Sequence, residues 1–392
     1  MKNEYEIIPY GRQSISEVDI QSVVDVLRSD YLTQGPVGPL FERELANYCK
    51  VKHSVAVNSA TSALHIACLA LNLGPDDWLW TSAITFVASA NCGLYCGANV
   101  DFVDIDPQTF NMCPIQLENK LMKAQKLGVL PKVVIPVHMC GQPCDMAAIY
   151  KLSEKYAFKI IEDASHAIGA RYKNEPVGNC RYSDITVFSF HPVKIITTAE
   201  GGIAVTNDEM LANRMTLLRS HGLTHVTKDM QVRPEDEIWN YQQQSLGFNY
   251  RMTELQAALG LSQLKKLDEF VTARQILASA YNKSLEAVDI IRPWQHPDTY
   301  SSYHLYPIKI NLSKSGKKQR DIYIALNNVG IKVNLHYIPV YRQPYFEQMG
   351  FKAGYCPNAE NYFKSSISIP IYTTMTFKQQ SFVVTQIKKA LQ

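Results

Sequence analysis

A single lysine stands in a stretch of the chain where a charged side chain needs a reason. Lys194 follows the apolar run 185–188 and the segment Ser189-Phe-His-Pro-Val, and it precedes Thr197-Thr-Ala-Glu-Gly-Gly202. The proline and the two glycines mark turns, so the pattern predicts that Lys194 lies in a loop at the end of a strand. The pKa of a lysine falls on burial, which suits its amine to Schiff-base chemistry with a carbonyl cofactor such as pyridoxal phosphate. The alternative is a solvated surface lysine, the more frequent role of a loop lysine.

A second segment could hold a phosphate. A short apolar run, 55–57, is followed by Asn58-Ser-Ala-Thr-Ser62 and then by apolar residues at helical spacing. The pattern predicts a strand, a polar turn and a helix. The start of a helix offers unpaired N–H groups and the positive end of its dipole, and the hydroxyl groups of Thr61 and Ser62 add donors for a phosphate. Plain N-capping by Ser or Thr is the simpler alternative.

A third segment, Lys159-Ile-Ile-Glu-Asp163-Ala-Ser-His166, ends an apolar run in two acids and then a histidine. Ligands of open α/β sheets bind beyond the carboxyl ends of the strands, so an acid here would reach a cofactor. Asp163 would pair with a ring nitrogen and keep it protonated, and His166 would hydrogen-bond the ring's phenolic oxygen. Glu162 is an alternative acid, but neighbouring strand residues point to opposite faces, so only one can face the cofactor. Asp163 as the cap of the next helix is the other alternative.

These segments, in this order, resemble the DegT/DnrJ/EryC1/StrS family of pyridoxal-phosphate sugar aminotransferases. The resemblance covers nearly the whole chain and includes Gly247-Phe-Asn-Tyr-Arg-Met-Thr-Glu-Leu-Gln-Ala-Ala-Leu-Gly260, Val137-His-Met-Cys-Gly-Gln142 and Asn334-Leu-His-Tyr-Ile-Pro339. It implies an α/β protein of the fold-type I class of pyridoxal-phosphate transferases, with a mostly parallel seven-stranded sheet. The large domain would span residues 1–260, with an N-terminal arm over 1–35, and a smaller α/β domain would span 261–392.

The resemblance also implies residue roles. Lys194 matches the lysine that binds the cofactor covalently and shuttles the proton, and Asp163 matches the partner of the pyridinium nitrogen. The other implied cofactor contacts are Thr61, Ser62 and Ser189 at the phosphate, Phe86 stacked on the ring, His166 near the ring hydroxyl, and Asn249 at the phosphate of the neighbouring subunit, which would make a homodimer part of the active site. His221, His336 and Tyr337 are implied substrate contacts, with structural roles in loops as the alternative.

The implied substrates are L-glutamate, as amino donor, and a UDP-4-keto-6-deoxy-HexNAc sugar. Within that class the resemblance favours UDP-2-acetamido-2,6-dideoxy-β-L-arabino-hex-4-ulose. A bacillosamine- or perosamine-type sugar is an alternative, as is a nucleotide-sugar binding protein that keeps the fold without activity. Some family members dehydrate the sugar and carry histidine in place of the lysine, and Lys194 argues against that chemistry.

One position departs from the family pattern. Ala199 precedes Glu-Gly-Gly, where members of the family usually have glycine. If the backbone there needs a positive φ, the alanine carries a strain of about 1 kcal/mol.

Composition excludes several classes of partner. The 392 residues carry a net charge of +3, which favours neither nucleic acid nor an anionic membrane. The N-terminal segment lacks an apolar signal core and no long uncharged apolar stretch occurs, so we expect a cytoplasmic enzyme. The nine cysteines are an odd, scattered set, as expected of free thiols. Cys140, Cys144 and His138 lack the second paired cluster of a structural zinc site, so we expect no metal.

Apolar runs at residues 55–57, 78–81, 100–103, 133–137, 159–161, 185–188 and 203–206 alternate with helical patterns and predict the strands of a mostly parallel sheet. Residues 221–245 turn polar and predict a long surface loop. It includes Lys228, Asp229, Arg233, Pro234, Glu235, Asp236 and Glu237. A helix over 252–270 is predicted to lead into the C-terminal domain, with strands at 306–310 and 332–335 and a helix at 320–329.

Overall fold

The core of the molecule is a seven-stranded sheet whose strands match the predicted runs. The computed structural model describes residues 7–232, 234, 236–237, 240–311 and 316–392. The strand order is β1-β9-β8-β5-β4-β2-β3. These strands are β1 (His53–Val57), β2 (Trp78–Ser82), β3 (Asn99–Val103), β4 (Val133–Ile135), β5 (Lys159–Asp163), β8 (Ile185–Ser189) and β9 (Gly202–Thr206). Only β9 runs antiparallel to its neighbours in this sheet, which confirms the mostly parallel prediction.

Each strand of the sheet supplies apolar side chains to both faces. In β4, Val133 and Ile135 pack into one core while Val134 packs into another. Parallel strands buried on both faces read as continuous apolar runs, which is why the sequence revealed them. The same alternation sends the side chains of adjacent residues at a strand end to opposite faces.

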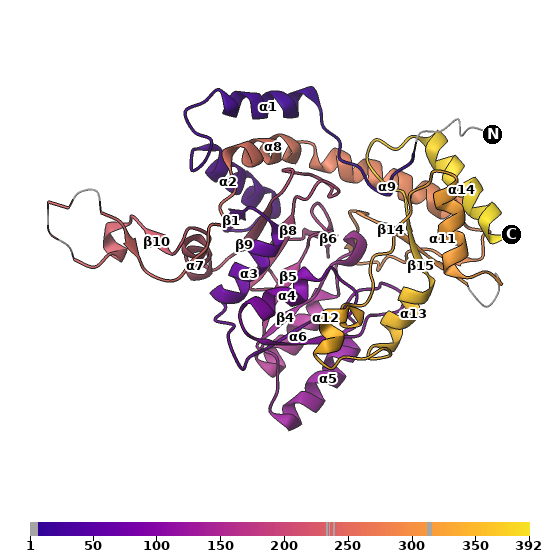
Figure 1. Ribbon diagram of the computed structural model, residues 1–392, viewed down its shortest axis with the longest axis horizontal. Coiled ribbons are helices and arrows are strands. Elements are labelled where there is room, and N and C mark those ends of the chain that lie inside the picture. The colour runs from indigo at the N-terminus through magenta and orange to yellow at the C-terminus, as the bar shows by residue number, and fades with distance from the viewer. Residues whose placement is uncertain (1–6, 233, 235, 238–239, 312–315) are drawn as a thin grey trace.

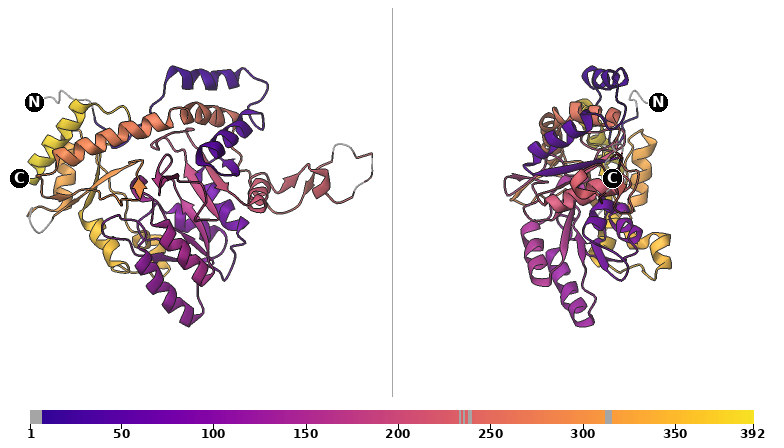
Figure 2. Two further views of the ribbon diagram at one scale, coloured as in Figure 1. Left: turned by 180° about the vertical axis from the view of Figure 1, so that it is seen from behind. Right: turned by 90° about the vertical axis from the view of Figure 1, so that its left-hand side faces the viewer.

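Helices cover both faces of the sheet (Figures 1 and 2). On one face lie α3 (Ala60–Ala70), α4 (Ala88–Tyr95) and α7 (Glu209–Arg219), whose apolar residues share a core with the sheet. On the other face lie α5 (Pro114–Leu127) and α6 (Met146–Tyr156), with α2 (Val37–Cys49), α8 (Glu254–Leu264) and α9 (Leu267–Ser284) covering the β1 side. Helix α1 (Glu17–Leu27) lies along α8 at the outside of the molecule (Figure 1).

The C-terminal part builds a second sheet with its own core. Strands β12 (Ile290–Ile291), β14 (Tyr306–Ile310) and β15 (Ser366–Ile369) form this sheet, in that order. Helices α11 (Gln319–Asn328) and α14 (Phe377–Leu391) pack on it, and α12 (Pro344–Gln348) and α13 (Pro357–Ser365) lie between it and the large sheet. Ile8 of the N-terminal arm is buried in this second core rather than beside the large sheet. The division at residue 260 stays a prediction.

The polar stretch 221–245 includes a hairpin that extends away from the body of the molecule (Figure 1). Its strands are β10 (Leu223–Thr224) and β11 (Gln242–Gln243), which pair antiparallel. A further small sheet joins β13 (Thr299–Tyr300), β6 (Arg171–Tyr172) and β7 (Glu175–Pro176). Arg233 and Glu235 of the polar stretch lie outside the described residues, as do residues 1–6 of the arm.

Two C-terminal predictions differ from the structure. The helix predicted over 252–270 is two helices, α8 and α9, because Lys266 leaves helical geometry and its ammonium group bonds to the buried Asp19 of α1 at 2.5 Å. The segment predicted as a strand at 332–335 makes only single bridges. Its hydrogen bonds are divided between the arm and β15, since Lys332 N donates to Ile8 O and Asn334 N donates to Ser368 O.

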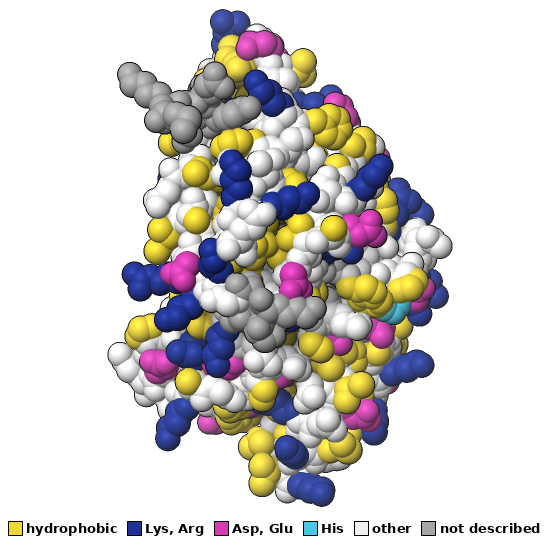
Figure 3. All heavy atoms as spheres, turned by 90° about the vertical axis from the view of Figure 1, so that its right-hand side faces the viewer, with side chains coloured by type: hydrophobic (Ala, Val, Ile, Leu, Met, Phe, Trp, Pro, Cys, Tyr) yellow, Lys and Arg dark blue, Asp and Glu magenta, His cyan; other side chains and the backbone are white. Residues whose placement is uncertain are grey.

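The surface beside α11 and α14 is mixed in character. Lys and Arg side chains are spread over that face and are interspersed with acidic and hydrophobic ones (Figure 3). In the part of the chain that the structure describes, no helix combines the length and the apolar character needed to span a bilayer.

Candidate active site

The predicted site segments meet because their strands end at one edge of the sheet. Strands β5 and β8 are adjacent and parallel, so Asp163 and Ser189 end them at the same edge. Strand β1 ends there too, and its last residue pairs with Gly202 at the start of the antiparallel β9. A Cβ at Gly202 would lie 2.4 Å from Ala60 N, so the glycine allows β9 to approach the start of α3 closely. The carboxyl edge of a parallel sheet is where ligands of such folds bind.

Asp163 is buried at the end of β5, and its carboxylate is held by two donors. Ser89 Oγ donates to Oδ2 at 2.6 Å, and the N–H of Ser165 donates to Oδ1 at 3.1 Å. Glu162 turns to the opposite face, where it bonds to His138. The prediction that the two acids point to opposite faces is therefore confirmed. Ser89, on α4, was not predicted, because one serine in a short apolar helix carries no spacing signal.

Lys194 lies in the loop between β8 and β9, as the sequence predicted. The loop is closed by bonds from Phe190 N to Gly201 O at 2.9 Å and from Thr198 N to Phe190 O at 3.0 Å. Burial lowers the pKa of the Lys194 amine to about 8, although the nearby Asp163 carboxylate acts in the opposite direction. A substantial part of the amine is therefore neutral near physiological pH, and a neutral amine is a nucleophile.

His166 lies close to Lys194 in a buried, neutral state. Burial, then the Lys194 charge, then His336, hold the pKa of His166 well below its usual value. The N–H of Cys140 donates to His166 Nδ1 at 3.3 Å, so the ring proton is on Nε2. That proton faces the hydroxyl group of Tyr337 at 3.2 Å, and the two rings stack with 22° between their planes.

The predicted substrate residues divide between two places. His336 is buried against Ser368, whose Oγ lies 2.9 Å from Nδ1, and burial followed by the Lys194 charge lowers the pKa of His336 to about 3. Tyr337 lies beside His166. His221 lies elsewhere: it is exposed at the base of the β10–β11 hairpin, with its N–H bonded to Phe248 O at 2.9 Å.

Aromatic rings from three parts of the chain surround this group. Phe86 is 58% exposed, and its ring centroid is 6.3 Å from that of Tyr337. Tyr10 of the N-terminal arm packs on His336 at 5.2 Å, and His304 packs on His166 at 4.5 Å. Tyr10 and His304 were missed from the sequence, because only the fold brings them to the site.

Thr61 and Ser62 lie in the first turn of α3. The N-cap is Ser59, which accepts a hydrogen bond from Ser62 N at 3.1 Å. The helix is therefore capped by a residue other than the predicted Thr61 and Ser62. Ser62 Oγ donates to Asn58 Oδ1 at 2.7 Å, and Thr61 is partly buried. The helix start is thus ordered by its own polar side chains.

Ser189 and Asn249 flank these elements. Ser189 Oγ accepts a long bond from His191 N at 3.5 Å. Asn249 is exposed, and its backbone oxygen accepts from Asn58 Nδ2 at 3.5 Å, which places it beside the start of α3 in the same subunit. A role for Asn249 in a neighbouring subunit stays a prediction.

Ala199 adopts the positive φ that the sequence raised as a condition. Its φ is 65°, in the left-handed region, and its N–H is bonded to Thr197 Oγ1 at 3.0 Å. The condition for backbone strain at this alanine is met.

All nine cysteines are buried and free. Among the residues that the structure describes, no group of three or more His, Cys, Asp or Glu side chains is arranged to hold a metal ion. His138 instead bonds to Glu162, and the thiol of Cys144 donates to Val137 O.

The α/β fold with its mostly parallel seven-stranded sheet is that of the fold-type I pyridoxal-phosphate transferases. A sequence profile of the DegT/DnrJ/EryC1/StrS aminotransferase family matches residues 13–388, and the chain belongs to this family of sugar aminotransferases. It is 37% identical over 374 residues to the spore coat polysaccharide biosynthesis protein SpsC of Bacillus subtilis, with 94% of this chain and 93% of that protein covered. It is 36% identical over 379 residues to the UDP-4-amino-4,6-dideoxy-N-acetyl-beta-L-altrosamine transaminase of Campylobacter jejuni, with 96% of each covered.

Solved structures agree with this assignment. Helicobacter pylori PseC, an aminotransferase involved in the biosynthesis of pseudoaminic acid, superposes with a TM-score of 0.88 at 31% identity, covering 98% of this chain and 99% of PseC. The sugar aminotransferase Spr1654 of Streptococcus pneumoniae, described as putative, is known in a PLP-form, which gives a TM-score of 0.88 at 28% identity over 98% of each chain. It is also known in a PMP-form.

Proposed function

We propose that this protein is a pyridoxal-phosphate-dependent aminotransferase that moves an amino group from L-glutamate to C4 of UDP-2-acetamido-2,6-dideoxy-β-L-arabino-hex-4-ulose. The product is UDP-4-amino-4,6-dideoxy-N-acetyl-β-L-altrosamine, an intermediate of pseudaminic acid biosynthesis. The observation that carries the proposal is the placement of Lys194, in the loop that follows β8, at the same sheet edge as the buried Asp163 carboxylate that ends the adjacent parallel strand β5.

The residues at the sheet edge fit pyridoxal phosphate. A nucleophilic amine, a carboxylate fixed by two donors and the start of a helix are the groups that its aldehyde, ring nitrogen and phosphate require. Lys194 would hold the aldehyde carbon and Asp163 the ring nitrogen. The phosphate would be held by Thr61, Ser62 and Ser189, with Phe86 against the ring and His166 near its hydroxyl group. Bound there, the cofactor supplies the electron sink that transamination needs.

Lys194 acts as nucleophile and as proton carrier. Its pKa of about 8 lies near physiological pH, so its Nζ can accept a proton from the α-carbon of the amino donor and return one to C4 of the sugar. Asp163 would keep the ring nitrogen protonated, and the hydrogen bond from Ser89 fixes the direction of its carboxylate. Neutral His166 offers no competing charge to Lys194.

The choice of sugar rests on the similarity to the Campylobacter transaminase and to PseC. The similar identity to SpsC keeps a different 4-keto-6-deoxy sugar, of the bacillosamine or perosamine type, as the alternative. We further propose a cytoplasmic homodimer in which Asn249 of each subunit reaches the phosphate site of the other. His336, near Lys194, Tyr337, beside His166, and His221 are proposed as substrate contacts.

The sugar is tested by offering both C5 epimers. Purified protein with pyridoxal phosphate and L-glutamate is incubated separately with the L-arabino and the D-xylo UDP-4-keto-6-deoxy-HexNAc, and amino-sugar formation is followed by NMR. Product from the L-arabino epimer alone supports the proposal. Product from the D-xylo epimer alone keeps the enzyme class and moves the protein to a bacillosamine-type reaction. Absence of product and of cofactor binding would favour a binding protein without activity.

A further inference from the structure

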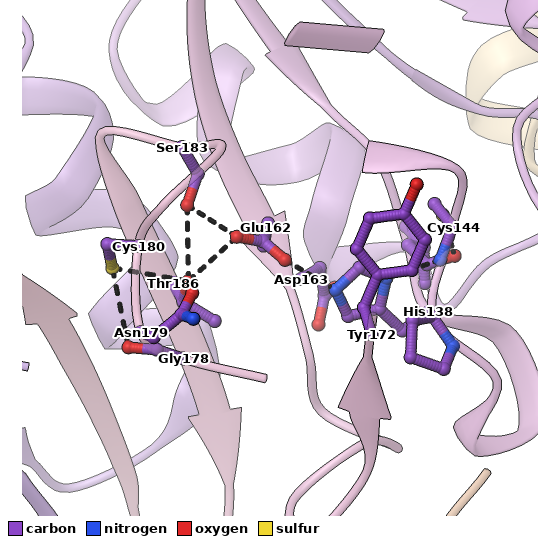
Figure 4. Close-up of polar contacts among 12 residues, drawn as sticks. His138, Cys144, Glu162, Asp163, Tyr172, Gly178, Asn179, Cys180, Ser183 and Thr186 are labelled. Atoms are coloured by element: carbon purple, nitrogen blue, oxygen red, sulfur yellow. Dashed lines mark hydrogen bonds and ion pairs between the residues drawn. The ribbon is translucent and has the colours of Figure 1, made fainter. Parts of the chain in front are cut away.

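A buried acid and histidine lie behind the candidate site, on the other face of β5 from Asp163. His138 Nε2 is 2.7 Å from Oε2 of Glu162, and neither side chain is open to solvent. The second carboxylate oxygen, Oε1, accepts bonds from Ser183 Oγ at 2.5 Å and Thr186 Oγ1 at 3.2 Å. Figure 4 shows Glu162 with Ser183 and Thr186 on one side and His138 on the other. Three donors thus satisfy a carboxylate that burial would otherwise disfavour.

The protonation of His138 follows from its neighbours. The N–H of Cys144 donates to His138 Nδ1 at 3.1 Å, so Nδ1 carries no proton and Nε2 donates to Glu162. The ring is therefore tied at one end to β5 and at the other to the chain that follows the turn 138–141. The roles considered from the sequence, Glu162 as an alternative cofactor acid and His138 as a metal ligand, do not use this arrangement.

The turn that His138 begins is the element that contacts the candidate site. The N–H of His138 donates to Asp163 O at 3.1 Å, and the N–H of Cys140 donates to His166 Nδ1 at 3.3 Å. Cys140 is in the left-handed region, with φ 61°, which is unfavourable for a residue with a Cβ. Such a conformation persists only where the surroundings hold it.

The turn is also closely packed on its other side. An added Cβ at Gly141 would lie 2.6 Å from Ser302 Oγ and 3.0 Å from His166 O. Met139 N donates to Asn111 Oδ1 at 2.8 Å. Within the described residues, the Glu162–His138 hydrogen bond is the side-chain contact that ties this turn to the strand bearing Asp163.

We propose that Glu162, acting through His138, is a positioning residue that holds the turn 138–141 so that the N–H of Cys140 keeps the His166 proton on Nε2. Its catalytic consequence rests on the proposed function, because it requires that His166 and Asp163 face the cofactor. The positioning itself does not, and it is measurable in cofactor-free protein.

The test uses two substitutions of His138 that each keep one of its two bonds. Asn is short and places its amide oxygen near the position of the histidine Nδ1. His138→Asn therefore keeps the bond from Cys144 N and loses the bond to Glu162. Gln is longer and places its amide N–H near the position of the histidine Nε2. His138→Gln therefore keeps the bond to Glu162 and loses the bond from Cys144 N. Ser183→Ala is the matched control, since it removes a donor from the other oxygen of Glu162 without touching the turn.

Two readouts separate positioning from general damage. Histidine ¹⁵N spectra of the cofactor-free proteins, with His166 assigned from its own substitution, report which ring nitrogen is protonated. We expect a single Nε2–H form in the unsubstituted protein, in His138→Gln and in Ser183→Ala, and a mixture in His138→Asn. In the holoenzyme, kcat of His138→Asn should fall about 10- to 100-fold at nearly unchanged KM, with His138→Gln restoring most of it.

Other patterns overturn the proposal. If His138→Asn keeps the His166 spectrum of the unsubstituted protein, or if His138→Gln shows the larger change, the Glu162 bond does not position the turn. If Ser183→Ala alters the His166 spectrum as much as His138→Asn does, and both variants have lost the same amount of thermal stability, the effect is a general loss of stability rather than positioning. A failed aminotransferase assay would leave the NMR result intact, so the two proposals fail separately.

Discussion

Ser89 Oγ donates a 2.6 Å hydrogen bond to Oδ2 of Asp163, joining the first turn of α4 to the end of β5. Thr85 Oγ1 lies 2.9 Å from Ser89 Oγ, so a short chain of hydroxyl groups ends on the carboxylate. A hydrogen bond to a charged group in a buried site fixes direction as well as energy. The carboxylate that the account places at the cofactor ring is therefore oriented by a residue on another element.

Removal of this hydroxyl should slow catalysis without unfolding the protein. Loss of a hydrogen bond to a charge costs about 1.5 to 3 kcal/mol, so we expect Ser89→Ala to lower kcat by roughly tenfold or more. Ser89→Thr keeps a hydroxyl and should recover part of the rate. Thr85→Val, which touches Ser89 but not Asp163, is the control for steady-state kinetics. Equal rates in Ser89→Ala and the unsubstituted enzyme would show that Asp163 does not depend on this bond.

The lowered pKa of Lys194 predicts a pH-dependent stability of the cofactor-free protein. The folded value of about 8 lies below the ordinary 10.5, so the unfolded chain binds more protons between these values. Burial of the charged amine therefore lowers the free energy of unfolding by its maximum amount below pH 8, and this cost disappears as the pH rises toward 10.5. A shift of this size is worth about 3 kcal/mol, and partial exposure of the side chain reduces it to about 2 kcal/mol.

Lys194→Met removes that cost. Urea unfolding of the cofactor-free proteins should show a gain in the free energy of unfolding of about 2 kcal/mol at pH 7, and about half of it at pH 9.5. The difference between the two pH values is the informative quantity, because the packing of methionine contributes equally at both. A gain that does not change with pH would contradict a lowered pKa at Lys194.

Ala199→Gly should stabilise the protein. A left-handed alanine is strained by about 1 kcal/mol, and the greater freedom of glycine in the unfolded chain offsets part of the relief, which leaves a gain of about 0.5 kcal/mol. Ala273→Gly in the interior of helix α9 is the matched control, with an expected loss of about 1 kcal/mol. Thermal or urea unfolding of both variants checks the opposite signs, and a loss of stability in both would remove the strain argument.

Subunit mixing tests the role of Asn249. If each site combines Lys194 of one subunit with Asn249 of the other, a mixed dimer of Lys194→Ala and Asn249→Ala contains one site with both residues intact. Mixing the two variants under exchange conditions should then raise the activity above the average of the separate variants. If Asn249 serves the α3 start of its own subunit, which it approaches through Asn58, mixing gives no such gain.

Much of this fold could be predicted because its strands are buried on both faces. The run at 133–137 reads as a strand without any partner in view, and Asp163 and Lys194 could be placed at strand ends from turn signals alone. The segment 332–335 instead alternates polar and apolar residues, and it finds its partners in Ile8 and Ser368, which are distant in the sequence. It does not form a regular strand because its hydrogen bonds are divided between these two partners, which only the tertiary fold brings to it.

Candidate site residues could be predicted from the sequence where their proposed role requires one residue type. Residues that only support another side chain could not. A lysine or an aspartate at a strand end is unusual and draws attention. Ser89, Tyr10 and His304 are ordinary residues in ordinary contexts, and their importance comes from the groups that folding brings to them. The start of α3 was predicted correctly, although its N-cap is Ser59 rather than Thr61 or Ser62. Phosphate binding there stays a prediction.

The most direct test of the account asks which lysine the cofactor binds. The protein is loaded with pyridoxal phosphate, reduced with borohydride, digested and analysed by mass spectrometry for a phosphopyridoxyl peptide. We expect a single modified residue, Lys194, loss of the label on prior addition of L-glutamate, and no label or turnover in Lys194→Ala. A label on another lysine, or transamination retained by Lys194→Ala, would contradict it.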